Sequence, residues 1–248
     1  MSDHDDATRY AHAAGQLLLE LRRSGVDDAQ PRRALADIGD VLANRLLLEL
    51  LATEHPDDRV LSEESVDDPR RVDAERVWII DPLDGTREFT EPDRVDWAVH
   101  VALWERDRGL TAGAVALPAQ DRVLSTAAPS PPASSGGRRL RVVVSRSRPP
   151  AAARRVADAL DAELVPMGSA GAKAMAVVDG VVDAYVHAGG QYEWDSAAPV
   201  AVAAAAGLHV SRIDGSVLEY NRRDPWLPDL VVCRSELAET VLSATASP

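Results

Sequence analysis

The sequence contains a single cysteine, Cys233, among its 248 residues. One cysteine excludes an intramolecular disulfide and a zinc site built on cysteines. Because Cys233 ends the apolar run Leu230-Val231-Val232-Cys233, we expect it to be a small core residue. Aromatic residues make up only 4% of the chain. The core must therefore be built mainly from Ala, Val and Leu.

Long apolar runs are also missing, since no segment approaches the roughly 20 apolar residues that a membrane helix needs. The first residues, Met1-Ser2-Asp3-His4-Asp5-Asp6, are acidic and have neither the basic start nor the apolar stretch of a signal peptide. We therefore expect a cytoplasmic protein without a membrane partner.

Positive charge is scarce: Lys and Arg total 27 against 40 Asp and Glu, which gives a net charge of −13, and Lys173 is the only lysine. Such a field repels nucleic acid and anionic membranes, so neither is an expected partner. It also repels phosphorylated small molecules. An acidic protein that acts on phosphates must invert the charge locally, and bound divalent cations do this most directly.

The first half of the chain mixes helical and strand patterns. Apolar periodicity predicts helices over 7–21 and 41–52, separated by a polar loop at 26–33. Short β-rich runs predict strands over 60–61, 77–80, 98–103, 112–117 and 122–126. The last three strands have short connections and are expected to be antiparallel.

The clearest linker is Pro129–Gly137, rich in Pro, Ser and Gly. It predicts a boundary between an N-terminal half, 1–128, and a C-terminal half, 138–248. In the second half, predicted strands and helices alternate: strands over 140–144, 163–165, 184–186 and 230–233, and helices over 151–160, 169–178, 195–206 and from 235 onward. This alternation favours parallel strands covered by helices.

The chain is organised around 77–89, where a buried strand leads into two carboxylates, Asp81 and Asp84. Pro82 cannot donate to a sheet ladder, so we expect the strand to stop at Asp81. Gly85-Thr86 then indicates a helical turn whose free N–H groups face an anion. Carboxylates that can hold cations thus lie beside donors that can hold a phosphate, which is the chemistry of a metal-assisted phosphatase.

Asp81-Pro82-Leu83-Asp84-Gly85-Thr86 resembles the metal-binding signature of the inositol monophosphatase superfamily. Three further segments resemble family motifs in the same order: Leu61–Ser65, Gly168-Ser169 with Lys173, and Glu193–Ala198. The resemblance implies an α/β (α+β) fold, namely the layered α-β-α-β-α sandwich of the inositol monophosphatase and fructose-1,6-bisphosphatase type. Its active site would lie between the halves.

The resemblance also implies two or three Mg²⁺ ions. Glu63, Asp81 and the carbonyl of Leu83 would hold one ion, and Asp81, Asp84 and Asp195 a second. Hard carboxylate oxygens suit this ion. The nucleophile would be a metal-bound water near Glu63, oriented by Thr86, with Asp40 receiving the threonine proton.

The implied substrate contacts include the N–H groups of Gly85 and Thr86. The other substrate-binding candidates are Asp84, Arg87, Ser145, Arg146, Lys173 and Asp195. Asp84–Phe89 further resembles the CysQ-type 3′(2′),5′-bisphosphate nucleotidases. That likeness implies removal of the 3′-phosphate from 3′-phosphoadenosine 5′-phosphate, or from its phosphosulfate, to give AMP and phosphate in sulfate assimilation. Lithium sensitivity and a homodimer are implied by the resemblance alone.

Each motif also has a structural interpretation. Glu63-Glu64 alone would be solvated surface, Asp195 or Asp40 a helix cap, and Arg87 or Lys173 a surface charge. Inositol-1-phosphate or fructose-1,6-bisphosphate is the alternative substrate, and a non-catalytic nucleotide-binding protein is a remote one. A haloacid-dehalogenase phosphatase is disfavoured, because the residue two before Asp84 is Pro82 and not a nucleophilic aspartate.

Overall fold

The computed structural model describes residues 2–24, 32–131 and 136–246. The helices are α1 (Asp3–Arg23), α2 (Arg32–Glu54), α3 (Thr86–Phe89), α4 (Ala151–Ala159), α5 (Ala170–Val178), α6 (Glu193–Ala205) and α7 (Ala238–Ala246). The strands are β1 (Arg59–Ser62), β2 (Arg76–Asp84), β3 (Ala98–Glu105), β4 (Gly109–Leu117), β5 (Arg122–Ser125), β6 (Arg141–Ser145), β7 (Glu163–Met167), β8 (Ala184–Tyr192), β9 (His209–Ser211) and β10 (Trp226–Cys233). Short 3₁₀ helices occur at Pro69–Asp73, Pro118–Gln120 and Ser235–Leu237.

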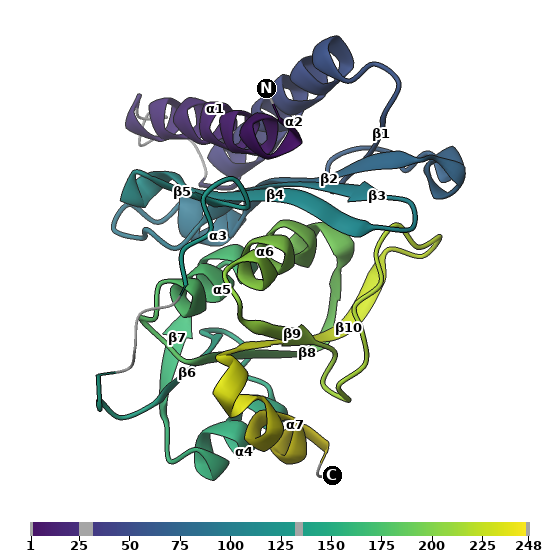
Figure 1. The fold of residues 1–248 in the computed structure, drawn as a ribbon. Helices are drawn as coiled ribbons and strands as arrows, with labels where there is room; N and C mark the ends of the chain where they lie inside the picture. Colours follow the sequence, from purple (N-terminus) through teal and green to yellow (C-terminus); the bar gives the residue numbers. More distant parts are fainter. Residues whose placement is uncertain (1, 25–31, 132–135, 247–248) are drawn as a thin grey trace.

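These elements form five layers (Figure 1). Helices α1 and α2 cover one face of the sheet β1-β2-β3-β4-β5, and α5 and α6 lie between this sheet and the sheet β7-β6-β8-β10-β9. Helices α4 and α7 cover the far face of the second sheet. The expected α-β-α-β-α sandwich is therefore confirmed.

The two sheets differ in strand direction. In the first, β1 is parallel to β2, and β2 through β5 are antiparallel. The short connections predicted this direction for β3, β4 and β5. In the second, β6 is parallel to β7 and β8, but β10 is antiparallel to β8 and β9. The expectation of parallel strands was thus wrong for β10. It is reached from β9 by a loop without a covering helix, which suits an antiparallel neighbour.

We predicted that the strand stops at Asp81, and this was wrong. Strand β2 runs through Pro82 to Asp84. Its register against β3 shifts between the pairs Asp81↔His100 and Asp84↔Ala98. Pro82 lies within this irregularity, where no ladder N–H is required of it. The irregularity leaves both carboxylates on the same ordered strand end.

Helix α2 begins at Arg32, well before the predicted start at Val41. Asp40 therefore lies inside the helix, and its interpretation as an N-cap is wrong. Residues 33–39 continue the helix because its inner face packs closely: a Cβ on Gly39 would lie 3.1 Å from Leu18 and 3.2 Å from Phe89. Of the predicted loop 26–33, residues 26–31 lie outside the described residues.

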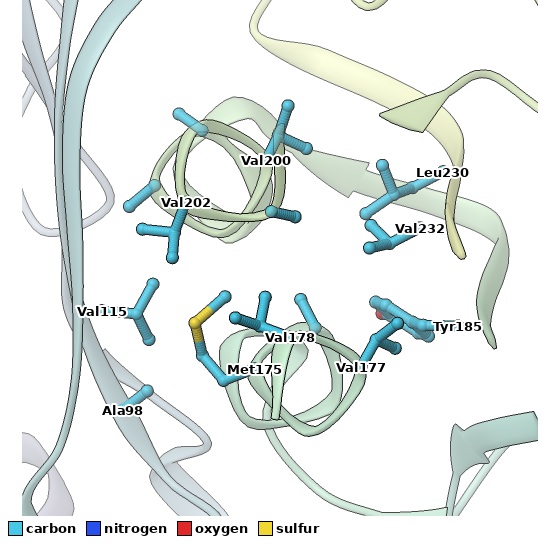
Figure 2. Packing of buried hydrophobic residues seen from close by; sticks show 14 of the residues in the cluster. Ala98, Val115, Met175, Val177, Val178, Tyr185, Val200, Val202, Leu230 and Val232 are labelled. Carbon is cyan, nitrogen blue, oxygen red and sulfur yellow. The ribbon is translucent and has the colours of Figure 1, made fainter. Parts of the chain in front are cut away.

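The main core fills the space between the sheets (Figure 2). Val115 and Ala98 of the first sheet face Met175 of α5, while Leu230 and Val232 approach α5 and α6 from the second sheet. As predicted, Ala, Val and Leu dominate this core, and Cys233 is buried in a neighbouring cluster.

The core contains residues from both sides of the predicted linker 129–137, of which 132–135 lie outside the described residues. The two-domain division stays a prediction. None of the helices described is both long and apolar enough to span a membrane.

Candidate active site

Three carboxylates meet where the end of β2 faces the start of α6. Oxygen atoms of Asp81, Asp84 and Asp195 all lie within 4.8 Å of one another. Asp81 is 1% exposed and Asp84 8% exposed. Asp195 follows Asp81 and Asp84 by more than 100 residues in sequence. The fold thus brings together three of the carboxylates that the sequence assigned to metal binding.

Burial and mutual repulsion make this cluster unfavourable when it is fully charged. Burial, with the charges of Glu63, Asp84 and Asp195, raises the pKa of Asp81 well above its usual value. Burial and the charge of Asp84 raise the pKa of Asp195 to about 6. A divalent cation would relieve both effects, and the oxygen-only donor set fits Mg²⁺.

Glu63 lies at the edge of the cluster, just after β1, where its backbone N–H donates to Ile80 O at 3.4 Å. Much of its side chain is exposed to solvent. Desolvation of the carboxyl by the surrounding protein, with the charges of Asp195 and Asp84, nevertheless raises the pKa of Glu63 to about 7. It is therefore an electrostatic member of the site and not a remote surface residue.

Asp84 is held by the N-terminus of α5. Its Oδ2 accepts from Ser169 Oγ at 2.5 Å and from Gly171 N at 2.6 Å, and its Oδ1 accepts from Ala170 N at 3.1 Å. His100 Nε2 lies 3.2 Å from Oδ2. Burial alone would raise the pKa of Asp84, but His100 and the other donors hold it well below its usual range. The pKa of Asp84 is thus shifted in the opposite direction to those of Asp81 and Asp195.

The Asp195 carboxylate both accepts a hydrogen bond at the start of α6 and belongs to the acidic cluster. Its Oδ2 accepts from Tyr192 N at 2.6 Å, which caps the start of α6. The same carboxylate belongs to the acidic cluster. The capping contact of Asp195 is therefore compatible with metal binding, and its role as a metal ligand stays a prediction.

The turn after β2 has the expected form. Gly85 has φ +86° and precedes the short helix α3, a conformation that favours glycine. Leu83 N donates to Asp81 Oδ1 at 3.1 Å, and the Leu83 carbonyl accepts from Thr86 Oγ1 at 3.2 Å. This carbonyl thus lies in the turn between Asp81 and Thr86, and its role as a metal ligand stays a prediction.

The predicted pairing of Thr86 with Asp40 is not seen among the described residues, because Thr86 Oγ1 bonds to Leu83 O instead. Asp40 is partly buried on α2, and burial with the charges of Glu64 and Asp37 raises its pKa to about 7. Its role as proton acceptor stays a prediction.

A pocket of about 460 Å³ opens beside the cluster. Its lining includes the predicted substrate-binding residues Asp84, Thr86, Arg87, Ser145, Arg146, Lys173 and Asp195. Arg87 is exposed there.

Two of the predicted cations have other partners. Arg146 pairs with Glu88 at 2.5 Å and with Glu91 at 2.6 Å. Lys173 is buried and donates through Nζ to Gly168 O and to Ser169 O. Surface charge is therefore the wrong interpretation for Lys173, which holds the turn that carries Ser169.

Comparison with known proteins agrees with this geometry. The sequence model of the inositol monophosphatase family matches residues 5–247. The chain belongs to this family. It is 55% identical, over 98% of its own length and 93% of the relative's, to a Mycobacterium leprae protein named 3′-phosphoadenosine 5′-phosphate phosphatase. It is 34% identical, over 76% of its length and 80% of the relative's, to the Escherichia coli 3′(2′),5′-bisphosphate nucleotidase CysQ.

Among solved structures, CysQ from Bacteroides thetaiotaomicron, a bacterial member of the inositol monophosphatase family, superposes with a TM-score of 0.79 at 26% identity. The match covers 92% of this chain and 96% of that one. The inositol monophosphatase fold expected from the motifs is thereby confirmed.

Sequence reasoning missed several residues of this inositol monophosphatase-family site. The sequence around His100 shows only an apolar strand, with no motif that marks a functional residue. Gly171 matters because α5 approaches His100 closely at this position, and a sequence pattern does not reveal that approach. Glu88 was quoted only as part of a motif, although it neutralises Arg146. Ser169 was predicted as the start of a helix, and its side chain does cap α5, but its hydrogen bond to Asp84 was not foreseen.

Proposed function

We propose that this protein is a Mg²⁺-dependent phosphatase that removes the 3′-phosphate of 3′-phosphoadenosine 5′-phosphate to give AMP and phosphate. The reaction class rests on one observation: three carboxylates within 4.8 Å of one another, buried or half-buried, at a pocket. The substrate is supported by the name of the M. leprae relative at 55% identity. The phosphosulfate analogue is a second expected substrate.

The metal ligands in this proposal are Glu63, Asp81, Asp84, Asp195 and the Leu83 carbonyl. When bound, two or three Mg²⁺ ions would supply an acidified water and would neutralise the phosphate oxygens. The chain's own contribution is to keep these oxygens together against their mutual repulsion. The hydrogen bonds from α5 to Asp84 and from Tyr192 N to Asp195 provide that support.

The remaining residues bind the substrate and control protons. Thr86 Oγ1, within reach of the Leu83 carbonyl, would orient the attacking water. The N–H groups of Gly85 and Thr86 and the exposed Arg87 side chain would hold the departing phosphate. Water adds to phosphorus, the P–O3′ bond breaks, and the 3′ oxygen leaves as a hydroxyl.

The 5′-phosphate would lie toward the loop that carries Ser145 and Arg146. Arg146 is already paired with Glu88 and Glu91, so its charge is largely neutralised before substrate binds. Contact with a phosphate would require Arg146 to share or exchange these carboxylates. A homodimer, lithium inhibition and a cytoplasmic location stay predictions.

The deciding experiment measures phosphate release from 3′-phosphoadenosine 5′-phosphate, inositol-1-phosphate and fructose-1,6-bisphosphate, with and without Mg²⁺. The expected result is the highest kcat/KM for the nucleotide, strict Mg²⁺ dependence, and a loss of at least about 100-fold in Asp84→Ala, equivalent to about 3 kcal/mol of lost stabilisation. Higher kcat/KM on the inositol or fructose phosphate would keep the metal chemistry and change the substrate. No turnover of any of the three would reject the proposal.

A further inference from the structure

His100, on β3, lies between Asp84 and Trp194, the residue that precedes Asp195. Its ring is 0% exposed. Nε2 lies 3.2 Å from Asp84 Oδ2, and Nδ1 lies 3.0 Å from the backbone carbonyl of Trp194. One side of the ring thus contacts a carboxylate of β2, and the other contacts the residue that precedes Asp195.

The ring is locked in this position by α5. A Cβ added to Gly171 would lie only 2.1 Å from His100 Nε2, so glycine is the residue that lets the helix N-terminus close over the ring. Gly171 N donates to the same Asp84 oxygen that Nε2 faces. His100 and the start of α5 therefore grip Asp84 from two directions.

The donors around Asp84 are unevenly divided between its two oxygens. Oδ2 receives Ser169 Oγ and Gly171 N and also faces His100 Nε2, whereas Oδ1 receives only Ala170 N. A carboxylate offers about four lone-pair sites in all. Oδ2 is saturated, and Oδ1 keeps a lone pair for a metal ion.

We propose that His100 is a positioning residue for the metal site: Trp194 O fixes the ring, and the ion-pair contact of Nε2 with Asp84 Oδ2 leaves Oδ1 for a metal ion. This inference rests on the metal site of the proposed function and adds a residue that neither the motifs nor the family resemblance identified. Residues that orient metal ligands typically change metal affinity or activity by 10- to 100-fold when mutated.

Two amide substitutions separate the contacts of the ring. In His100→Asn the amide nitrogen takes the place of Nδ1 and retains a donor to Trp194 O, but nothing reaches Asp84. In His100→Gln the amide nitrogen takes the place of Nε2 and keeps a polar contact beside Asp84 Oδ2. The measurement is the Kd for Mn²⁺ of the full-length protein, from electron paramagnetic resonance of free Mn²⁺, without substrate.

We expect His100→Asn to raise the Mn²⁺ Kd by about 10- to 100-fold and His100→Gln to raise it less. The Mg²⁺ concentration for half-maximal phosphate release should rise by the same factor as the Kd, while excess Mg²⁺ restores kcat. A residue with a purely structural role would lower the melting temperature without this separation.

His209→Asn is the matched control, because His209 on β9 is a partly buried histidine whose Nε2 lies 2.9 Å from Ser211 Oγ and which does not line the pocket. It should lower stability and leave the Mn²⁺ Kd unchanged. If His100→Asn does not fold, Gly171→Ala replaces it, since its methyl group must displace the ring. Gly171→Ala should raise the Kd in the same way.

Wild-type Mn²⁺ affinity in both His100→Asn and Gly171→Ala, or an equal loss in His100→Asn and His100→Gln, would overturn the proposal. The outcome is independent of the substrate. A wild-type protein that binds Mn²⁺ but does not hydrolyse 3′-phosphoadenosine 5′-phosphate would reject the proposed function and still test His100.

Discussion

Arg71 and Asn221 bond to each other in both directions. Arg71 Nη1 donates to Asn221 Oδ1 at 2.9 Å, and Asn221 Nδ2 donates to Arg71 O at 3.1 Å. The N–H groups of Asn221 and Arg222 then donate to the carboxylate of Glu193, two residues before Asp195. This buried network ties the segment before β2 to the start of α6, where Asp195 of the carboxylate cluster lies.

Replacement of Arg71 by Met should therefore destabilise the protein strongly. Arg71 is 0% exposed, and its loss leaves the buried Asn221 Oδ1 without this donor, while the exposed Asp67 loses its partner at 2.6 Å. We expect the free energy of unfolding to fall by about 1–3 kcal/mol, measured by urea denaturation. The neighbouring Arg70→Met is the control, because Arg70 is exposed and its pair with Asp68 lies in solvent. If both variants lower the free energy of unfolding equally, the buried network adds no more stability than a solvent-exposed ion pair.

Ser169→Ala should affect both stability and metal use. Ser169 Oγ donates to Asp84 Oδ2 and accepts from Ala172 N at 2.9 Å, so one hydroxyl caps α5 and holds a metal ligand. Loss of the cap costs about 1–2 kcal/mol, and the Mg²⁺ requirement should rise about 10-fold. Ser2→Ala also removes an N-cap, from α1, and should leave Mg²⁺ activation unchanged. A Mg²⁺ requirement that stays at the wild-type value in Ser169→Ala would contradict the second role.

How far sequence alone reaches is clear from β2 and α6. Their motifs are local, so Asp81, Asp84 and Asp195 could be assigned before the fold was known, and the fold then brought them together. Arg146 shows the opposite case. Its partners Glu88 and Glu91 lie more than 50 residues away in sequence, and no local pattern indicates that the cation is already neutralised.

Element boundaries were missed for a similar reason. A proline usually ends a strand, but the register shift in β2 removes the hydrogen bond that Pro82 could not make. Gly39 lowers helix propensity, yet α2 runs through it because tight packing against Leu18 and Phe89 needs a residue without a side chain. In both cases tertiary contacts outweigh local preference.

Without metal, the protein should become less stable as pH rises. The pKa values of Asp195, about 6, and Glu63, about 7, lie above those of an unfolded chain, near 4. Between about pH 4 and about pH 7 the folded state thus binds more protons, and the free energy of unfolding falls with pH by on the order of 2 kcal/mol. Saturating Mg²⁺ should reduce this slope to the part that comes from Asp40 and Glu193, whose pKa values are also raised to about 7.

The measurement is urea unfolding across that pH range in EDTA and in Mg²⁺. Asp195→Asn removes one of the titrating groups, so its slope in EDTA should be shallower than that of the wild type. A stability that rises with pH in EDTA would show that the carboxylates are already relieved by something other than a metal ion.

Lys173 and Arg87 both line the pocket, but replacement by Met should lower stability at Lys173 and weaken substrate binding at Arg87. Lys173 is buried and donates to two backbone carbonyls, so Lys173→Met should lower the free energy of unfolding by about 1–3 kcal/mol. Arg87 is exposed and makes no side-chain ion pair among the described residues. Arg87→Met should raise KM about 3- to 10-fold at unchanged stability. If Arg87→Met leaves KM at its wild-type value, Arg87 does not contact the phosphate.

Gln191→Met should stabilise the protein and weaken its substrate binding. Gln191 lines the pocket, is 7% exposed, and both polar atoms of its amide are buried with no hydrogen-bond partner among the described residues. An unsatisfied buried amide costs about 1–3 kcal/mol, which an apolar side chain of equal length avoids. Proteins keep such groups mainly where function uses them.

We therefore expect Gln191→Met to raise the free energy of unfolding by about 1 kcal/mol while KM for 3′-phosphoadenosine 5′-phosphate rises about 10-fold. KM for inositol-1-phosphate, which has no base, should change little. Gln120→Met is the control, because Gln120 Nε2 already donates to Val95 O at 3.1 Å, and its loss should bring no gain in stability. A less stable Gln191→Met would mean that the amide has a bonding partner in solution, and the argument for its use by the substrate would then fail.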